Sequence, residues 1–88
     1  MALNTSFQYY IPMATKHPSD DSAFLKKIGA NISRLRKKAG ISQEELADLA
    51  KIDRSYLGSV ERGERNISAI NIRKIAFSLK TQPQTLLK

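Results

Sequence analysis

Two short apolar faces separated by a break constrain the fold of this chain more than any other feature. Residues 43–62 read QEELADLAKIDRSYLGSVER. Apolar residues recur at the spacing of one helix face in the first half, at Leu46, Ala47 and Ala50, and again in the second half, at Leu57 and Val60. The break falls at residues 51–52. The segment therefore predicts two short helices joined by a tight turn, each with one face buried.

The outer face of the second predicted helix is short, polar and cationic. At about 100° per residue, the side opposite the apolar residues carries Arg54, Ser55, Gly58, Ser59 and Arg62. Such side chains suit the base edges of a DNA major groove. Gly58 either lets the helix approach the bases closely or is simply a tolerated small residue. We interpret the segment as a helix-turn-helix whose second helix reads DNA, rather than as a solvated helix face.

Length and charge narrow the classes of function. Eighty-eight residues with 41% hydrophobic content suit one small domain with one core. The net charge of +7 predicts a polyanionic partner. Double-stranded DNA is favoured over a membrane, because no apolar run approaches the roughly 20 residues of a spanning helix.

The chemistry-bearing residues are sparse. Cysteine is absent, which fits a cytoplasmic protein and excludes a thiolate metal site. The only histidine, His17, stands beside Pro18, and the acidic residues show no paired-carboxylate arrangement. We therefore expect that this chain is not an enzyme and that it binds no cofactor, no metal and no small-molecule substrate.

The chain divides near residue 20. Residues 1–20 have no helical period, and we expect a flexible or extended N-terminal arm. Its apolar patch of Phe7, Tyr9, Tyr10 and Ile11 is large enough to dock on the domain or on a partner subunit. Residues 21–88 form the predicted domain.

Capping signals place the helices of that domain. The first helix runs from Asp21 to near Gly40 and aligns four apolar residues on one face: Phe24, Ile28, Ile32 and Leu35. Ser42, which forms a capping box with Glu45, and then Asp53 and Ser68 mark the next three helix starts. The fourth helix spans residues 69–79, and Pro83 opens a short fifth one. The pattern predicts an all-α fold.

The stretch ISQEELADLAKIDRSYLGSVERGERNISAINIRKIAFSL resembles the Cro/C1 (Xre-type) helix-turn-helix family, and especially the controller proteins of restriction-modification systems. The resemblance covers roughly residues 24–87, and the motifs SQEELA, RSY and ERGERNIS carry it. It implies a five-helix, lambda repressor-like domain that regulates transcription and binds palindromic operators as a homodimer. Lys51 occupies a turn position where many members have Gly or Asn, so we expect mild strain or a different turn geometry there.

The resemblance also implies roles for individual residues. Base contacts fall on Arg54, Ser55 and Ser59, and an Arg at a helix start can donate two hydrogen bonds to guanine. An ion pair is implied between Arg36 and Glu61. Contacts to the DNA backbone fall on Gln43, Tyr56, Arg62, Arg65, Asn66 and Arg36. Gln43 stands at a helix start that favours phosphate, whereas Tyr56 is either a phosphate contact or a partly buried aromatic.

One domain of this size reads too few base pairs to find a unique site, so we expect two copies on one operator. The apolar groups predicted to be available for the dimer interface are Ile70, Leu86 and Leu87. The alternative is an antitoxin-like protein-interaction module with secondary DNA binding. The polar side chains Arg54, Ser55 and Ser59 favour DNA, since a helix that masks a partner protein carries large apolar anchors.

Overall fold

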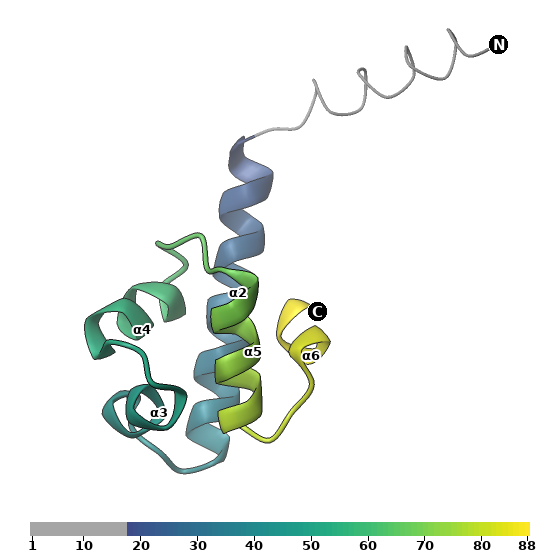
Figure 1. The fold of residues 1–88 in the computed structure, drawn as a ribbon. Coiled ribbons are helices and arrows are strands. Elements are labelled where there is room, and N and C mark those ends of the chain that lie inside the picture. The colour runs from purple at the N-terminus through teal and green to yellow at the C-terminus, as the bar shows by residue number, and fades with distance from the viewer. Residues whose placement is uncertain (1–17) are drawn as a thin grey trace, which may run out of the picture.

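The computed structural model describes residues 18–88, which form five helices and no strand. They are α2 (Pro18–Lys38), α3 (Gln43–Ala50), α4 (Arg54–Glu61), α5 (Ala69–Ser78) and α6 (Pro83–Leu87) (Figure 1). The predicted all-α, five-helix architecture is confirmed for this part of the chain. The first helix begins at Pro18, three residues before its predicted start. The apolar patch of the arm lies outside the described residues, so its docking stays a prediction.

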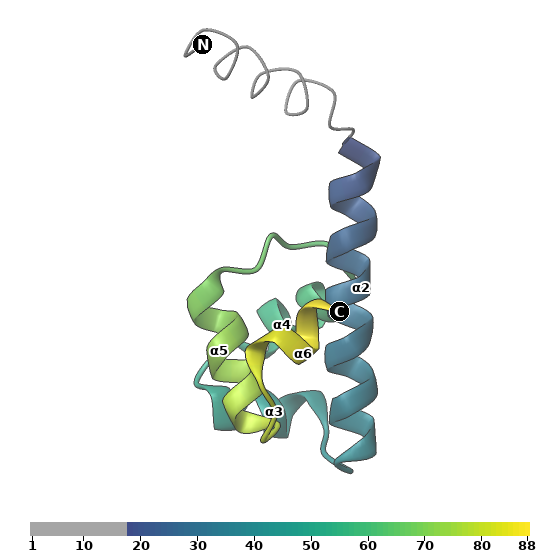
Figure 2. The same ribbon diagram turned by 90° about the vertical axis from the view of Figure 1, so that its right-hand side faces the viewer.

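The long helix α2 is the support on which the short helices assemble. Figure 2 shows α3 to α6 on one side of α2, while its first turns project beyond them. Helices α4 and α6 contact α2 directly, and α3 contacts α4 and α5. A single apolar core fills the space between them, formed by Ile28, Ile32, Leu46, Ala47, Ala50, Leu57, Val60, Ile67, Ile75, Ala76 and Leu86.

Side-chain caps fix the starts of three helices. Glu45 N donates to Ser42 Oγ at 3.0 Å and Ser42 N donates to Glu45 Oε1 at 2.7 Å, which completes the predicted capping box of α3. The carboxylate of Asp53 accepts from Tyr56 N at 3.1 Å at the start of α4. Ser68 Oγ accepts from Asn71 N at 3.1 Å at the start of α5. All three predicted caps are confirmed.

The turn between α3 and α4 is left-handed at a residue with a Cβ. Lys51 has φ 59° and ψ 45°, and its N–H donates to Asp48 O at 3.3 Å. The expected strain is therefore present, at about 1–2 kcal/mol for such a conformation. The alternative of a different turn geometry is wrong.

Two predicted apolar positions are placed differently by the structure. Leu86 is fully buried, and its carbonyl accepts from Asn31 Nδ2 at 2.9 Å, which ties α6 to α2. The prediction that Leu86 is available to a second subunit is wrong, because α6 turns this side chain into the core of its own domain. The prediction that Phe24 lies on the buried face of the first helix is wrong: the side chain is 47% exposed, because it lines an open groove together with Ile72 and Leu87.

Leu86 and Leu87 form a matched pair for testing this packing. Leu86→Ala is expected to lower the free energy of unfolding by about 2–5 kcal/mol, since it opens a cavity in the core. Leu87→Ala, at a residue 38% exposed, is expected to cost less than about 1 kcal/mol. Urea unfolding followed by circular dichroism at one protein concentration measures both. Equal losses would contradict the placement of α6.

Candidate nucleic-acid interface

The start of α4 presents its polar side chains to solvent. Arg54 and Ser55 are exposed in the first turn, and Ser59 is half-buried one turn later. Ser59 Oγ donates to Ser55 O at 3.0 Å, so toward a base it acts as an acceptor through its lone pairs. The first turn of α4 carries no acidic residue, although the carboxylate of its N-cap Asp53 takes up the N–H of Tyr56. Its free N–H groups and the two exposed side chains together form a surface for hydrogen bonding to an anionic, acceptor-rich ligand.

Gly58 does not lie on this exposed surface. A Cβ there would stand 3.3 Å from Arg62 Nη1 and 3.6 Å from Gln43 Oε1, and the residue is buried beneath those two side chains. The prediction that Gly58 belongs to the outer face of α4 is wrong. The missing side chain leaves room for Gln43 and Arg62 to cross over the helix.

A buried ion pair holds the other end of α4. Arg36 Nε donates to Glu61 Oε2 at 2.7 Å and Arg36 Nη2 donates to Glu61 Oε1 at 3.0 Å, a bidentate geometry. The two side chains are only 11% and 5% exposed. The hydrogen bond to Glu61 raises the pKa of Arg36 above its ordinary value, against the opposing effect of burial, so the guanidinium stays charged. This is the ion pair that the resemblance implies.

The same carboxylate also binds α3. Gln43 Nε2 donates to Glu61 Oε1 at 2.9 Å, and Arg36 Nη1 donates to Ile41 O at 3.0 Å. Arg36 thus uses its guanidinium inside the protein, which removes support for its predicted phosphate contact. The side-chain amide of Gln43 is engaged as well. A phosphate contact at Gln43 is better served by the backbone N–H groups at the start of α3.

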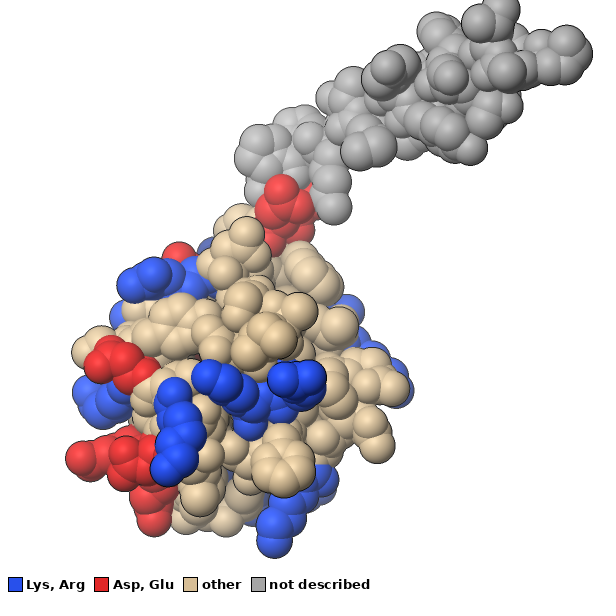
Figure 3. Space-filling model, viewed as in Figure 1, with Lys and Arg blue, Asp and Glu red and all other residues tan. Residues whose placement is uncertain are grey.

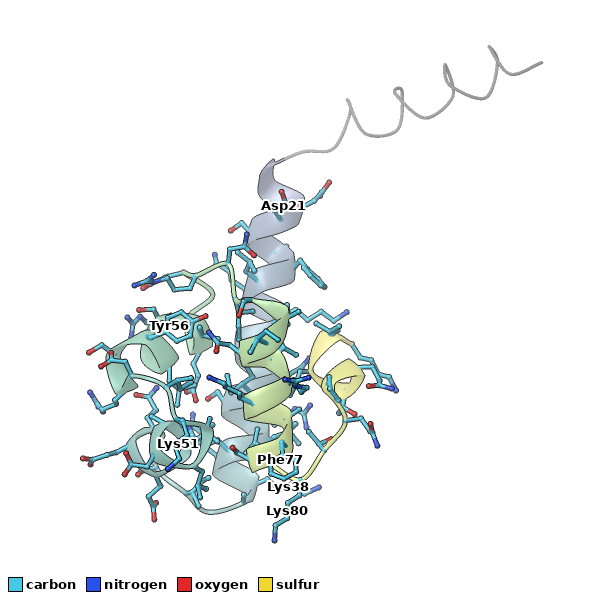
Figure 4. The ribbon with its side chains drawn as sticks, viewed as in Figure 1. Asp21, Lys38, Lys51, Tyr56, Phe77 and Lys80 are labelled. Atoms are coloured by element: carbon cyan, nitrogen blue, oxygen red, sulfur yellow. The ribbon has the colours of Figure 1, made fainter. Side chains whose placement is uncertain are left out.

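Tyr56 is anchored at the edge of the core. Its ring is half-buried against the core, and its hydroxyl oxygen accepts from Asn71 Nδ2 at 3.0 Å (Figure 4). The guanidinium carbon of Arg65 lies 5.5 Å from the ring centroid, a cation–π distance. Tyr56 is therefore a partly buried aromatic whose O–H can still donate to a phosphate. Sequence reasoning missed Asn71, whose only signal is a polar residue between two isoleucines.

Exposed cationic and polar side chains extend from the end of α4 into the following loop. Arg62, Arg65 and Asn66 are exposed, and Arg62 Nε pairs with Glu64 Oε2 at 3.1 Å. Both partners of this pair are more than half exposed, at 61% and 57%, so water screens it and Arg62 can exchange partners. Figure 3 shows Lys and Arg distributed over this view of the molecule, while a group of Asp and Glu lies over α3 at the lower left and others lie at the start of α2 and at the left edge.

The helix-turn-helix family matches residues 32–86 of this chain. The chain belongs to the Cro/C1-type helix-turn-helix family. Its function is that of a DNA-binding transcriptional regulator, as the spacing of the two short helices and the cationic face of α4 predict.

Several control proteins and one restriction-modification controller protein are similar to this chain. It is 42% identical over 60 residues to the control protein C.BamHI of Bacillus amyloliquefaciens, covering 67% of this chain and 74% of that relative. It is 38% identical over 73 residues to the control protein C.SmaI of Serratia marcescens, covering 80% and 87%. The crystal structure of the controller protein C.AhdI from Aeromonas hydrophila superposes with a TM-score of 0.71 at 50% identity, covering 73% of this chain and 97% of that chain.

Residues 18–88 contain neither a candidate membrane span nor a candidate metal site. None of the described helices combines the length and the apolar character that a membrane-spanning helix requires. Within the same residues, no group of three or more His, Cys, Asp or Glu side chains is placed to hold a metal ion.

The buried and the exposed carboxylate give a matched test of the ion pair. Glu61→Gln leaves Arg36 buried without its counter-charge, and we expect a loss of about 3 kcal/mol in the free energy of unfolding. Glu64→Gln removes a carboxylate that pairs only at the surface, and we expect a change within about 0.5 kcal/mol. Urea unfolding of both variants measures the difference, and equal effects would show that Glu61 is not a structural anchor.

Proposed function

We propose that this regulator binds palindromic operator DNA as a homodimer and controls a restriction-modification system. The observation that carries the proposal is the start of α4, where Arg54 and Ser55 are exposed on a helix whose opposite side is buried and whose end is tied to α2. The system is inferred from the relatives, because C.BamHI and C.SmaI are control proteins and C.AhdI is a restriction-modification controller protein.

Base reading is assigned to Arg54, Ser55 and Ser59. Arg54 stands at the exposed first position of α4, where its guanidinium can donate to O6 and N7 of one guanine. Ser55 can donate to or accept from a base edge, whereas Ser59 accepts. These contacts place the start of α4 in the major groove.

Backbone binding is assigned to residues around that helix. Gln43 contributes its backbone N–H at the start of α3, and Tyr56 contributes its hydroxyl. Arg62, Arg65 and Asn66 lie exposed at the end of α4 and in the loop that follows it. Contacts of this kind fix the register of a protein on the duplex and supply affinity that depends on salt.

The homodimer follows from the demands of specificity. A single α4 reaches only a few base pairs, so two copies on half-sites about one helical turn apart are needed for a unique site. Ile70 in the first turn of α5 and Leu87 at the end of α6 are 52% and 38% exposed. Leu87 also borders an apolar groove of about 300 Å³ that Phe24 and Ile72 line. We place the second subunit against these groups, without Leu86.

Arg54→Ala tests base reading. We expect a loss of about 1–3 kcal/mol in binding a duplex selected from a random pool by the unmodified protein, with relaxed preference at one guanine in each half-site. Lys80→Asn is the matched control, because it removes one positive charge at the end of α5 and asparagine tolerates the left-handed φ of 58° there. Fluorescence anisotropy measures both variants. If Arg54→Ala keeps affinity and base preference, Arg54 is not the guanine contact.

A double variant at Ile70 and Leu87 tests the position of the dimer interface. Ile70→Asp combined with Leu87→Asp is expected to dissociate the dimer and to lower affinity for the selected duplex, because two buried apolar contacts become charged. Phe77→Asp, at an 83% exposed residue near the other end of α5, and removal of residues 1–17 are expected to leave the dimer intact. Sedimentation velocity measures all three proteins. Dissociation by Phe77→Asp or by the deletion, without dissociation by the double variant, would move the interface elsewhere.

A further inference from the structure

The end of α4 rests directly on the backbone of α2. Gly29 is buried at the contact, and a Cβ built there would overlap the carbonyl oxygen of Val60 and stand 2.5 Å from that of Glu61. Both obstacles are backbone atoms, which cannot rotate away as the tip of a side chain can. Any side chain at Gly29 would therefore push α4 away from α2.

A second glycine repeats the contact one helical turn away. At Gly63, just beyond α4, a Cβ would stand 2.6 Å from Lys26 Cγ and 2.7 Å from Lys26 Cα. Lys26, Gly29 and Arg36 lie on one face of α2 by their helical spacing. The backbone contacts at the first two and the ion pair of the third with Glu61 hold the end of α4 along that face.

We propose that Gly29 is a positioning residue for base reading: its missing side chain sets the distance between α2 and α4, and thereby the aim of Arg54 and Ser55. The inference rests on the proposed role of α4 in reading bases. Helix α4 has eight residues and behaves as a short rigid rod about 12 Å long, so a displacement at its end carries to its start. A glycine inside a helix lowers its stability relative to alanine. The close contact with α4 explains why glycine occupies this position nevertheless.

Specific and non-specific binding should respond differently to such a displacement. A bidentate contact between Arg and guanine requires the helix to stand within a fraction of an ångström of its proper place. Contacts to phosphate through long, exposed side chains such as Arg62 and Arg65 adjust to a small shift. A misplaced α4 therefore loses sequence preference before it loses its attraction to DNA.

Gly29→Ala is the test, with Ala30→Gly as its control. We expect Gly29→Ala to bind the duplex selected by the unmodified protein about tenfold more weakly, the equivalent of one lost bidentate contact. Its affinity for a scrambled duplex of the same composition should change less than about twofold. Ala30 is the exposed neighbour, and its replacement by glycine lowers helix stability without touching α4. That control should keep the ratio of the two affinities.

Each outcome decides between the possibilities. If the unmodified protein does not distinguish the two duplexes, the proposed function fails; if it does, and folded Gly29→Ala distinguishes them equally well, the positioning role alone is overturned. Gly63→Asn, which tolerates the left-handed backbone, introduces a Cβ at the second contact and should show the same selective loss. If Gly29→Ala does not fold at low temperature with a stabilising osmolyte, Gly63→Asn decides: a wild-type ratio overturns the proposal, and a selective loss supports it.

Discussion

The carboxylate of Glu61 is the interaction on which the arrangement of the domain depends. It accepts two hydrogen bonds from Arg36 of α2 and one from Gln43 of α3, while its own backbone belongs to α4. Three helices that are separate in sequence therefore meet at one anion. A buried pair of this kind adds little net stability, because both charges lose their water. Its value lies in geometry, since a bidentate pair accepts only a narrow range of helix orientations, whereas an apolar contact at the same place would tolerate sliding.

Gly29 of α2 and Gly63 of the loop after α4 add a steric constraint to this ion pair. The ion pair limits how α4 can rotate on α2, and the contact at Gly29 limits how far it stands away. Gly58 has a related role on the outer side, where its small size admits the crossing side chains of Gln43 and Arg62. The surface proposed to face DNA is thus supported by residues whose partners lie inside the protein, and its shape is set before any ligand arrives.

The sequence predicted the features that depend on local spacing. Helix starts at Ser42, Asp53 and Ser68 follow from capping chemistry over three residues. For Lys51 the sequence left strain and a different turn geometry open, and the structure shows the left-handed backbone. The wrong predictions concern tertiary packing, which helical periodicity does not determine. Leu86 and Leu87 are neighbours in an amphipathic pair, and only the docking of α6 decides which of them is buried. Phe24 shares the apolar face of α2, but it lines an open groove instead of the closed core. Gly58 lies on the polar side of α4 by periodicity, and no periodicity shows that Gln43 reaches across it.

The acidic residues are distributed unequally between the starts of α3 and α4. The first turn of α3 carries Glu44 and Glu45, which offset the positive end of that helix and use part of it in the capping box. The first turn of α4 has no acidic residue and begins with an exposed arginine. Of the two helix starts in the helix-turn-helix, α4 carries fewer carboxylates, since only its N-cap Asp53 is acidic and the exposed Arg54 offsets that charge. The net charge of +7 brings the protein to any polyanion. The unequal helix starts therefore favour an orientation in which α4 faces the nucleic acid, which is also the orientation that the proposed base contacts require.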